Sequence, residues 1–399
     1  MDRLYLDNAA TSFPKPPAVH DAMLRYATQV GASPGRGTYA ESIEGASLIA
    51  RCRQRLGELF NHASPDHCIF TLNTTDALNL GIWGIVEHLR RCENGSASTD
   101  LHVVATQMDH NSVLRPFRQL EALGVRTTIV PVDTRTGLVD PDRVAAAIEP
   151  ATVLVGVVHA SNVTGVIQPI EPIAKACNHL GIPILVDAAQ SAGHLPIDVQ
   201  EMGIDLLAVP GHKGLLGPLG TGALLIRPGL EHQMATIRQG GTGSQSELDV
   251  QPSRLPDRFE PGSHNTPGIV GLSEGVAYLL ERGIDAVRAH ELDLIGRVLD
   301  GLSDLELAGY RLLGPTDPAQ RLGVFALTHE QLDPQELAMI LETEHGILAR
   351  AGLHCAPGAH DAMGTSHGGG ATRLSLSPFS TEADVERMLT ALQAVAVVA

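Results

Sequence analysis

The chain has 399 residues, of which 43% are hydrophobic and 18% are charged, enough material for two globular domains with large cores. Its formal net charge of -17 argues against nucleic acid or an anionic membrane as a partner, because no basic block compensates that charge.

The cysteines and the start of the chain bear on its compartment. The five cysteines include no CxxC pair, which suggests reduced thiols in the cytosol. The first residues lack the apolar stretch of a signal peptide, and no apolar run approaches the ~20 residues that a membrane span needs. We therefore expect a soluble, cytoplasmic protein.

Between residues 68 and 226, short β-rich apolar runs alternate with helical patterns such as Asp76–Arg90 and Glu171–Leu180. This alternation predicts an α/β fold whose mostly parallel, seven-stranded sheet is covered by helices on both sides. The expected strands are Cys68–Leu72, His102–Thr106, Thr127–Val132, Val153–Val158, Ile182–Val186, Leu206–Val209 and Ala223–Ile226.

After residue 256 the pattern changes to longer helices and then to a smaller α+β segment. We expect a large domain at 16–255, a small C-terminal domain at 256–399, and an N-terminal arm at 1–15 packing nearby. The glycine-rich stretch Gly364–Gly370 predicts a mobile loop. The expected elements are helices Gly268–Glu281 and Asp285–Leu302, strand Gly323–Leu327, helix Pro334–Glu344, strand Gly346–Ala349 and a last helix from Glu382.

Lys213 and Asp187 each follow an apolar run that predicts a buried parallel strand, so both should reach the same rim of the sheet. This pair suits pyridoxal phosphate (PLP). The lysine amine forms an imine with the aldehyde, and the carboxylate keeps the ring nitrogen protonated. Taken singly, a lysine among glycines is more often a solvated turn residue, and an aspartate after a strand is often a helix N-cap.

Thr74 and Thr75 follow a strand and open a helix, where hydroxyls and free N–H groups make a phosphate site. An ordinary helix cap is the commoner use of such residues. His110 also follows a strand, and it either lies flat on an aromatic ring or satisfies a loop.

Two further patterns carry less weight. Gly217–Gly222 precedes a strand instead of opening a helix, so it does not fit a nucleotide-binding loop. A cluster of potential ligands matches no common zinc spacing, and we expect no metal: His354, Cys355, His360 and His367.

Together these segments resemble the cysteine desulfurases of the class V aminotransferase family, which have the PLP-dependent transferase fold of type I. The resemblance runs the length of the chain, in family order. Its motifs are Tyr5–Thr11, Thr74–Asn79, Met108–His110, Ala160–Gly165, Val186–Gln190, Gly211–Lys213, Phe259–Pro267, Arg350–Pro357 and Thr372–Ser375.

The resemblance implies a role for each matching residue. Lys213 forms the Schiff base and moves protons, Asp187 pairs with the pyridine nitrogen, and Gln190 approaches the ring oxygen. His110 stacks on the ring and takes part in catalysis. The phosphate is bound by Thr75 and His212 beside Thr74, and by Ser263 from the other subunit of a homodimer. Asn162 and Arg373 bind the substrate carboxylate. Cys355 accepts the sulfur, and a cation or a histidine such as His354 would activate it.

The implied reaction converts L-cysteine to alanine, leaves sulfur on Cys355 as a persulfide, and passes it to an acceptor protein. Pro210 departs from the family, because many relatives have a serine there and proline donates nothing to a phosphate. The alternatives are a selenocysteine lyase, a transaminase or an epimerase on the same fold, or a scaffold protein without activity.

Overall fold

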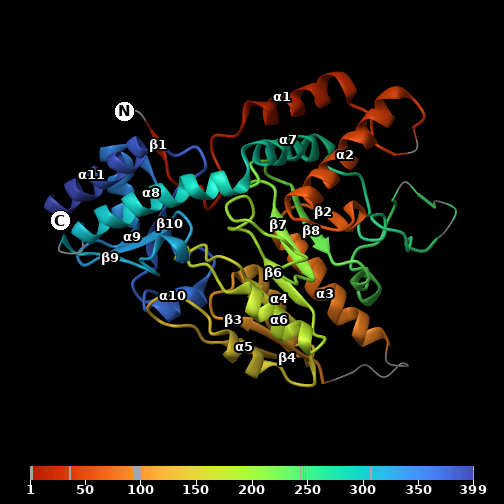
Figure 1. Ribbon diagram of the computed structural model, residues 1–399, viewed down its shortest axis with the longest axis horizontal. Helices are drawn as coiled ribbons and strands as arrows, with labels where there is room; N and C mark the ends of the chain where they lie inside the picture. Colours follow the sequence, from red (N-terminus) through yellow and green to blue (C-terminus); the bar gives the residue numbers. More distant parts are fainter. Residues whose placement is uncertain are drawn as a thin grey trace.

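The computed structural model describes residues 3–35, 37–92, 100–242, 244, 245, 247, 249–305 and 308–398. A central twisted sheet and a smaller sheet lie side by side, with helices packed around both (Figure 1). No helix in these described ranges combines the length and the apolar character that crossing a bilayer requires.

The central sheet has seven strands in the order β2-β8-β7-β6-β5-β3-β4. All neighbouring pairs are parallel except those of β8, which runs antiparallel to β2 and β7. The predicted α/β class with a mostly parallel seven-stranded sheet is confirmed. The strands are β2 Cys68–Thr71, β3 His102–Thr106, β4 Arg126–Val130, β5 Thr152–Val158, β6 Ile184–Asp187, β7 Leu206–Pro210 and β8 Gly222–Ile226.

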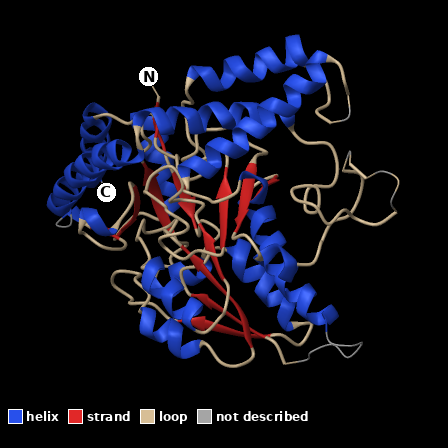
Figure 2. Ribbon diagram, turned by 45° about the vertical axis from the view of Figure 1, so that its right-hand side comes forward, coloured by secondary structure: helices blue, strands red, loops and turns tan. Residues whose placement is uncertain are grey.

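Successive side chains of these strands point to opposite faces of the sheet and pack into two separate hydrophobic cores, one on each face. On β6, Ile184 and Val186 face one core and Leu185 faces the other. Helices α2, α5, α6 and α7 cover the first face, and α3 and α4 cover the second, so the strands are enclosed on both sides (Figure 2). These helices are α2 Ala40–Leu59, α3 Thr74–Cys92, α4 Asn111–Glu121, α5 Pro141–Ala147, α6 Ile170–His179 and α7 Thr266–Arg282.

A third core lies under the four-stranded antiparallel sheet β12-β13-β10-β9. Helix α7 packs on α1 and α2 and contributes to the first core, whereas most of α8 lies in the third. The division at residue 256 stays a prediction. The elements are α8 Ile284–Leu305, β9 Tyr310–Leu312, β10 Val324–His329, α9 Pro334–His345, β11 Ile347–Leu348, β12 Arg350–Gly352, α10 Pro357–Met363, β13 Ala371–Ser375 and α11 Glu382–Val398.

The N-terminal arm connects the small sheet to the loop after β7 of the large sheet. Its strand β1 (Leu4–Tyr5) pairs with β11, and Asp7 forms a bridge with Ser375 of β13. The arm then reaches the loop after β7, where the Ser12 N–H donates to the His212 carbonyl at 3.1 Å. The remaining elements are α1 Pro17–Arg25, the π-helix η1 Tyr26–Val30, and the short 3-10 turns η2 Pro65–His67, η3 Leu230–Gln233 and η5 Pro318–Gln320.

Two parts of the C-terminal region differ from the simple loop that its glycines suggest. Residues 357–363, just after Cys355, form helix α10. The stretch Gly364–Gly370 is a hydrogen-bonded turn, in which the Gly370 N–H donates to the Thr365 carbonyl at 3.0 Å. Gly364 has a φ of 72°, which ends α10 in the left-handed region that glycine tolerates best.

Candidate active site

Lys213 and Asp187 meet at one cavity, as the strand pattern predicts. Asp187 is the last residue of β6, Lys213 lies three residues beyond the end of β7, and these two strands are parallel neighbours. The cavity holds about 100 Å³. Its lining includes eight of the residues singled out from the sequence: Thr74, Thr75, His110, Asn162, Asp187, Gln190, His212 and Lys213.

The surroundings of Lys213 favour an uncharged amine. Burial lowers the pKa of Lys213 to about 8, and the nearby Asp187 opposes this shift only in part. A pKa near neutrality leaves a useful fraction of free amine under physiological conditions, which a nucleophilic or basic lysine requires.

Asp187 is only 2% exposed, and burial raises the pKa of its carboxyl group. Its Oδ1 accepts the Ala189 N–H at 2.9 Å, and the charge of Lys213 partly counters the shift. A buried carboxylate of this kind is stabilised by a cation placed against it, so the group fits the protonated nitrogen of a pyridine ring.

The part of the cavity wall formed by Thr74, Thr75 and His212, here called the phosphate end, has unsatisfied polar groups that fit a phosphate. Helix α3 begins at Thr74, so its N-terminus points at the cavity. In the described chain the buried Thr74 Oγ1 and His212 Nδ1 have no hydrogen-bond partner. Buried polar atoms without partners are costly, and phosphate oxygens would supply the missing ones. Pro210 is the last residue of β7 and contributes no N–H.

His110 caps helix α4. Its Nδ1 accepts the Ser112 N–H at 3.1 Å and lies 2.8 Å from Ser112 Oγ. That hydroxyl is in turn 2.9 Å from Thr75 Oγ1, so the histidine is linked to the phosphate end. Burial, assisted by Lys213, lowers the pKa of His110 to about 4, and the ring is therefore neutral at physiological pH.

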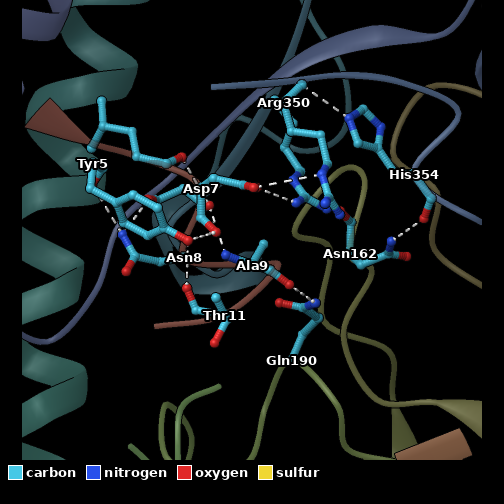
Figure 3. Close-up of polar contacts among 12 residues, drawn as sticks. Tyr5, Asp7, Asn8, Ala9, Thr11, Asn162, Gln190, Arg350 and His354 are labelled. Carbon is cyan, nitrogen blue, oxygen red and sulfur yellow. Dashed lines mark hydrogen bonds and ion pairs between the residues drawn. The ribbon is translucent and has the colours of Figure 1, made fainter. Parts of the chain in front are cut away.

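Asn162 and Gln190 connect the cavity to other segments (Figure 3). Asn162 Nδ2 donates to the His354 carbonyl at 2.6 Å, and Gln190 Nε2 donates to the Ala9 carbonyl at 2.9 Å. Both amides line the cavity and at the same time hold a neighbouring loop or the arm in place.

Arg373 contacts Asn162 but does not belong to the cavity lining. Its Nη2 binds Asp7 Oδ1 at 2.7 Å and its Nη1 donates to the Asn162 carbonyl at 3.0 Å. Arg350 is 3.5 Å from the other oxygen of Asp7, so two guanidinium groups share one carboxylate (Figure 3). Asp7 was not singled out from the sequence, and substrate binding by Arg373 stays a prediction.

Cys355 is exposed and has a φ of 57° in a turn after β12. Its carbonyl accepts the N–H of Asn111, the residue after His110, at 2.9 Å. Activation of Cys355 by a cation or by a histidine such as His354 stays a prediction, and the structure defines the charge state of that histidine. Burial lowers the pKa of His354 to about 3, and its Nδ1 faces His360 Nε2 at 3.2 Å. The histidine is therefore neutral, and it cannot serve as the cation that activates Cys355.

Two other expectations concern places outside the cavity. Ser263 is exposed and lines a separate hollow with residues of η1 and α2, so reaching a phosphate would require a second chain. In the described ranges no three side chains of His, Cys, Asp or Glu are grouped so as to hold a metal ion, and this includes the cluster around His354.

The N-terminal arm forms a part of the site that the sequence did not indicate. The His212 carbonyl accepts from Thr11 Oγ1 at 3.0 Å and from Lys15 Nζ at 3.1 Å, and Ser12 Oγ donates to the Lys213 carbonyl at 2.9 Å. These contacts fix the backbone that carries Lys213. Each partner is about 200 residues away in sequence, and no local pattern marks such a contact.

A lysine and a buried carboxylate at adjoining strand ends, next to a helix N-terminus, form a site whose groups fit PLP. The model of the Aminotransferase class-V family matches residues 4–388. The chain therefore belongs to the class V aminotransferase family, and it is an enzyme.

Curated relatives cover nearly the whole chain. A probable cysteine desulfurase of Aeropyrum pernix is 34% identical over 98% of this chain and 93% of its own, and one of Methanothermobacter thermautotrophicus is 32% identical over 99% and 95%. Among solved structures, the apo cysteine desulfurase of Thermococcus onnurineus has a TM-score of 0.90 at 30% identity, covering 100% of this chain and 95% of that one. The cysteine desulfurase CsdA of Escherichia coli, in an S-sulfonic acid form, has a TM-score of 0.85 at 25% identity, covering 99% and 95%.

Proposed function

We propose that the protein is a PLP-dependent L-cysteine desulfurase that converts cysteine to alanine and carries the sulfur as a persulfide on Cys355. The observation that carries this proposal is the pairing of half-buried Lys213 with buried Asp187 at one cavity, where the buried Thr74 Oγ1 and His212 Nδ1 have no hydrogen-bond partner. The names of the relatives and of the solved structures support the choice of substrate.

Each residue has a role that follows from its surroundings. Bound PLP would supply an electron sink for the charge that builds on the substrate carbon. Asp187 would keep the ring nitrogen protonated, and Thr74, Thr75 and His212 would hold the phosphate. Lys213 has a pKa near 8, so its free amine can take the proton from the substrate Cα.

The sulfur step needs a thiolate that reaches the cavity. Cys355 is exposed, and its loop is tied to the site through Asn111 and Asn162. The Cys355 thiolate would attack the substrate sulfur, and the Cβ–S electron pair would pass to the carbon skeleton, which a proton then completes as alanine. The product on the enzyme is Cys355–S–SH, ready for an acceptor protein.

The test is to incubate the PLP-loaded protein with L-cysteine, to measure alanine and sulfide, and to search Cys355 by mass spectrometry for an added sulfur. Alanine in step with sulfur on Cys355 is the expected result. A ketoacid product, or full activity of Cys355→Ala with cysteine, would contradict the proposal, and selenide release that survives Cys355→Ala would favour a selenocysteine lyase.

We also propose a homodimer in which Ser263 of each chain reaches the phosphate site of the other. Ser263 is exposed and lies outside the cavity of its own chain, and the exposed apolar side chains Leu24 and Ile43 lie on the α1 and α2 helices. Sedimentation should give a dimer, and Ser263→Ala should weaken PLP binding. A fully active monomer would contradict this arrangement.

A further inference from the structure

The hydrogen bonds of His110 determine which of its ring nitrogens carries the proton. The Ser112 N–H points at Nδ1 from 3.1 Å, in the N-cap geometry of α4. A backbone N–H can only donate, so Nδ1 must accept. In a neutral imidazole the proton is then on Nε2, on the other side of the ring.

The charge state of the ring supports the same assignment of a single proton to Nε2. Burial is the main reason that the pKa of His110 falls to about 4, and the cations Lys213, Arg115 and Arg373 act in the same direction. The N-terminus of α4 adds a positive field of its own. A second proton on this ring is therefore disfavoured at neutral pH.

We infer that Ser112 is a positioning residue, which holds His110 as the Nε2–H tautomer so that the ring offers the cavity a hydrogen-bond donor and not a proton acceptor. His110 and Ser112 both line the cavity. The Ser112 hydroxyl, within 2.8 Å of Nδ1 and 2.9 Å of Thr75 Oγ1, ties the ring orientation to the phosphate end.

This inference rests on the proposed function and assigns different proton-transfer roles to Lys213 and His110. Lys213 is the group that accepts protons, since its amine is free in part near pH 8. His110 keeps its own proton and stabilises negative charge on the substrate by hydrogen bonding, as a neutral imidazole near a helix N-terminus can do.

The direct test is a nitrogen spectrum of the PLP-loaded protein labelled with 15N-histidine, with His110 assigned by its loss in His110→Gln. The expected result at pH 7 is a neutral ring protonated on Nε2, with exposed His20 as an internal reference. A ring protonated on Nδ1, or a doubly protonated ring, would overturn the inference. The spectrum is read before any substrate is added, so it does not depend on whether the protein releases alanine.

Two pairs of variants test the consequence for catalysis. His110→Gln keeps an N–H donor, whereas His110→Glu offers only an acceptor. Per PLP-loaded site, we expect His110→Gln to retain at least about tenfold more kcat than His110→Glu, and the reverse order would overturn the inference. Ser112→Ala should lower kcat and raise the apparent pKa of His110, and Ser112→Thr, which keeps the hydroxyl, should restore both. If kcat and the pKa of His110 are unchanged in Ser112→Ala, that hydroxyl has no role, and the inference that Ser112 positions His110 is contradicted.

Discussion

A buried ion pair between Arg53 and Glu260 joins helix α2 to the segment that carries Ser263. The guanidinium and the carboxylate meet through two contacts, at 2.8 and 2.5 Å, and Glu260 Oε1 also accepts the Phe70 N–H at 2.6 Å. The two side chains are only 6% and 2% exposed. Glu260→Gln preserves the shape of the side chain but leaves the Arg53 cation buried without its counter-charge.

Removing one partner of a buried ion pair costs about 3–5 kcal/mol, whereas an exposed pair contributes about 0–1 kcal/mol. We therefore expect Glu260→Gln to lower the free energy of unfolding by about 3 kcal/mol or more. Urea unfolding followed by circular dichroism measures this change. The matched control is Asp293→Asn, which removes one of the two carboxylate partners of Arg297 in a pair that is about half exposed, and it should cost less than about 1 kcal/mol.

The double variant Arg53→Met with Glu260→Gln separates the unpaired charge from other effects. Because no charge remains buried, the double variant should be more stable than Glu260→Gln alone. A cost below about 1 kcal/mol for Glu260→Gln, or a double variant with the sum of the two single losses, would refute the reasoning.

Three other outcomes follow from the site. Thr11, Ser12 and Lys15 form a clamp on the backbone of His212 and Lys213. Lys15→Met removes one donor of this clamp, and it should release PLP at least several-fold faster than the wild type. Lys175→Met, a change of the same kind on the exposed face of α6, should not, and equal rates measured by absorbance would contradict the clamp. The rate of imine formation between PLP and the apoprotein should rise as the pH passes through about 8, because only the free Lys213 amine reacts and the fraction of free amine grows above its pKa. A midpoint near the pKa of ordinary lysine, ~10.4, would contradict the lowered pKa. A thiol reagent at pH 7, followed by peptide mass spectrometry, should label Cys355 much faster than the buried thiols, because burial raises the pKa values of Cys52, Cys68 and Cys177. Prompt labelling of any of these three would count against their burial.

The strands of the large sheet were predictable because each is a short apolar run with buried faces on both sides. Each of the seven expected ranges lies within about two residues of the observed strand at either end. Helix α2 was not predicted, since its buried positions include Ser42, Gly45 and Gly57, which weaken the apolar stripe. Helix α10 has seven residues and contains a glycine, too little for a periodic signal.

The site, too, has features that a local sequence pattern predicts and features that it does not. Asp187 ends its strand, and Lys213 and Thr75 each follow one, so the rule that ligands gather at the carboxyl ends of parallel strands places the three together. The pairing of Asp7 with Arg373 joins residues 366 positions apart, and no local pattern contains it. The neutral state of His354 depends on burial and on the nearby cation Arg373, which only the packed structure defines.

The sequence by itself determined the order of strands and helices and the residue types delivered to the rim of the sheet, because periodicity and chain connectivity are local properties. Only the tertiary structure decided which hydrogen bonds and charges surround those residues. The tautomer of His110, the lowered pKa of Lys213 and the clamp from the N-terminal arm all depend on groups brought together from distant segments, and burial among those groups sets their protonation.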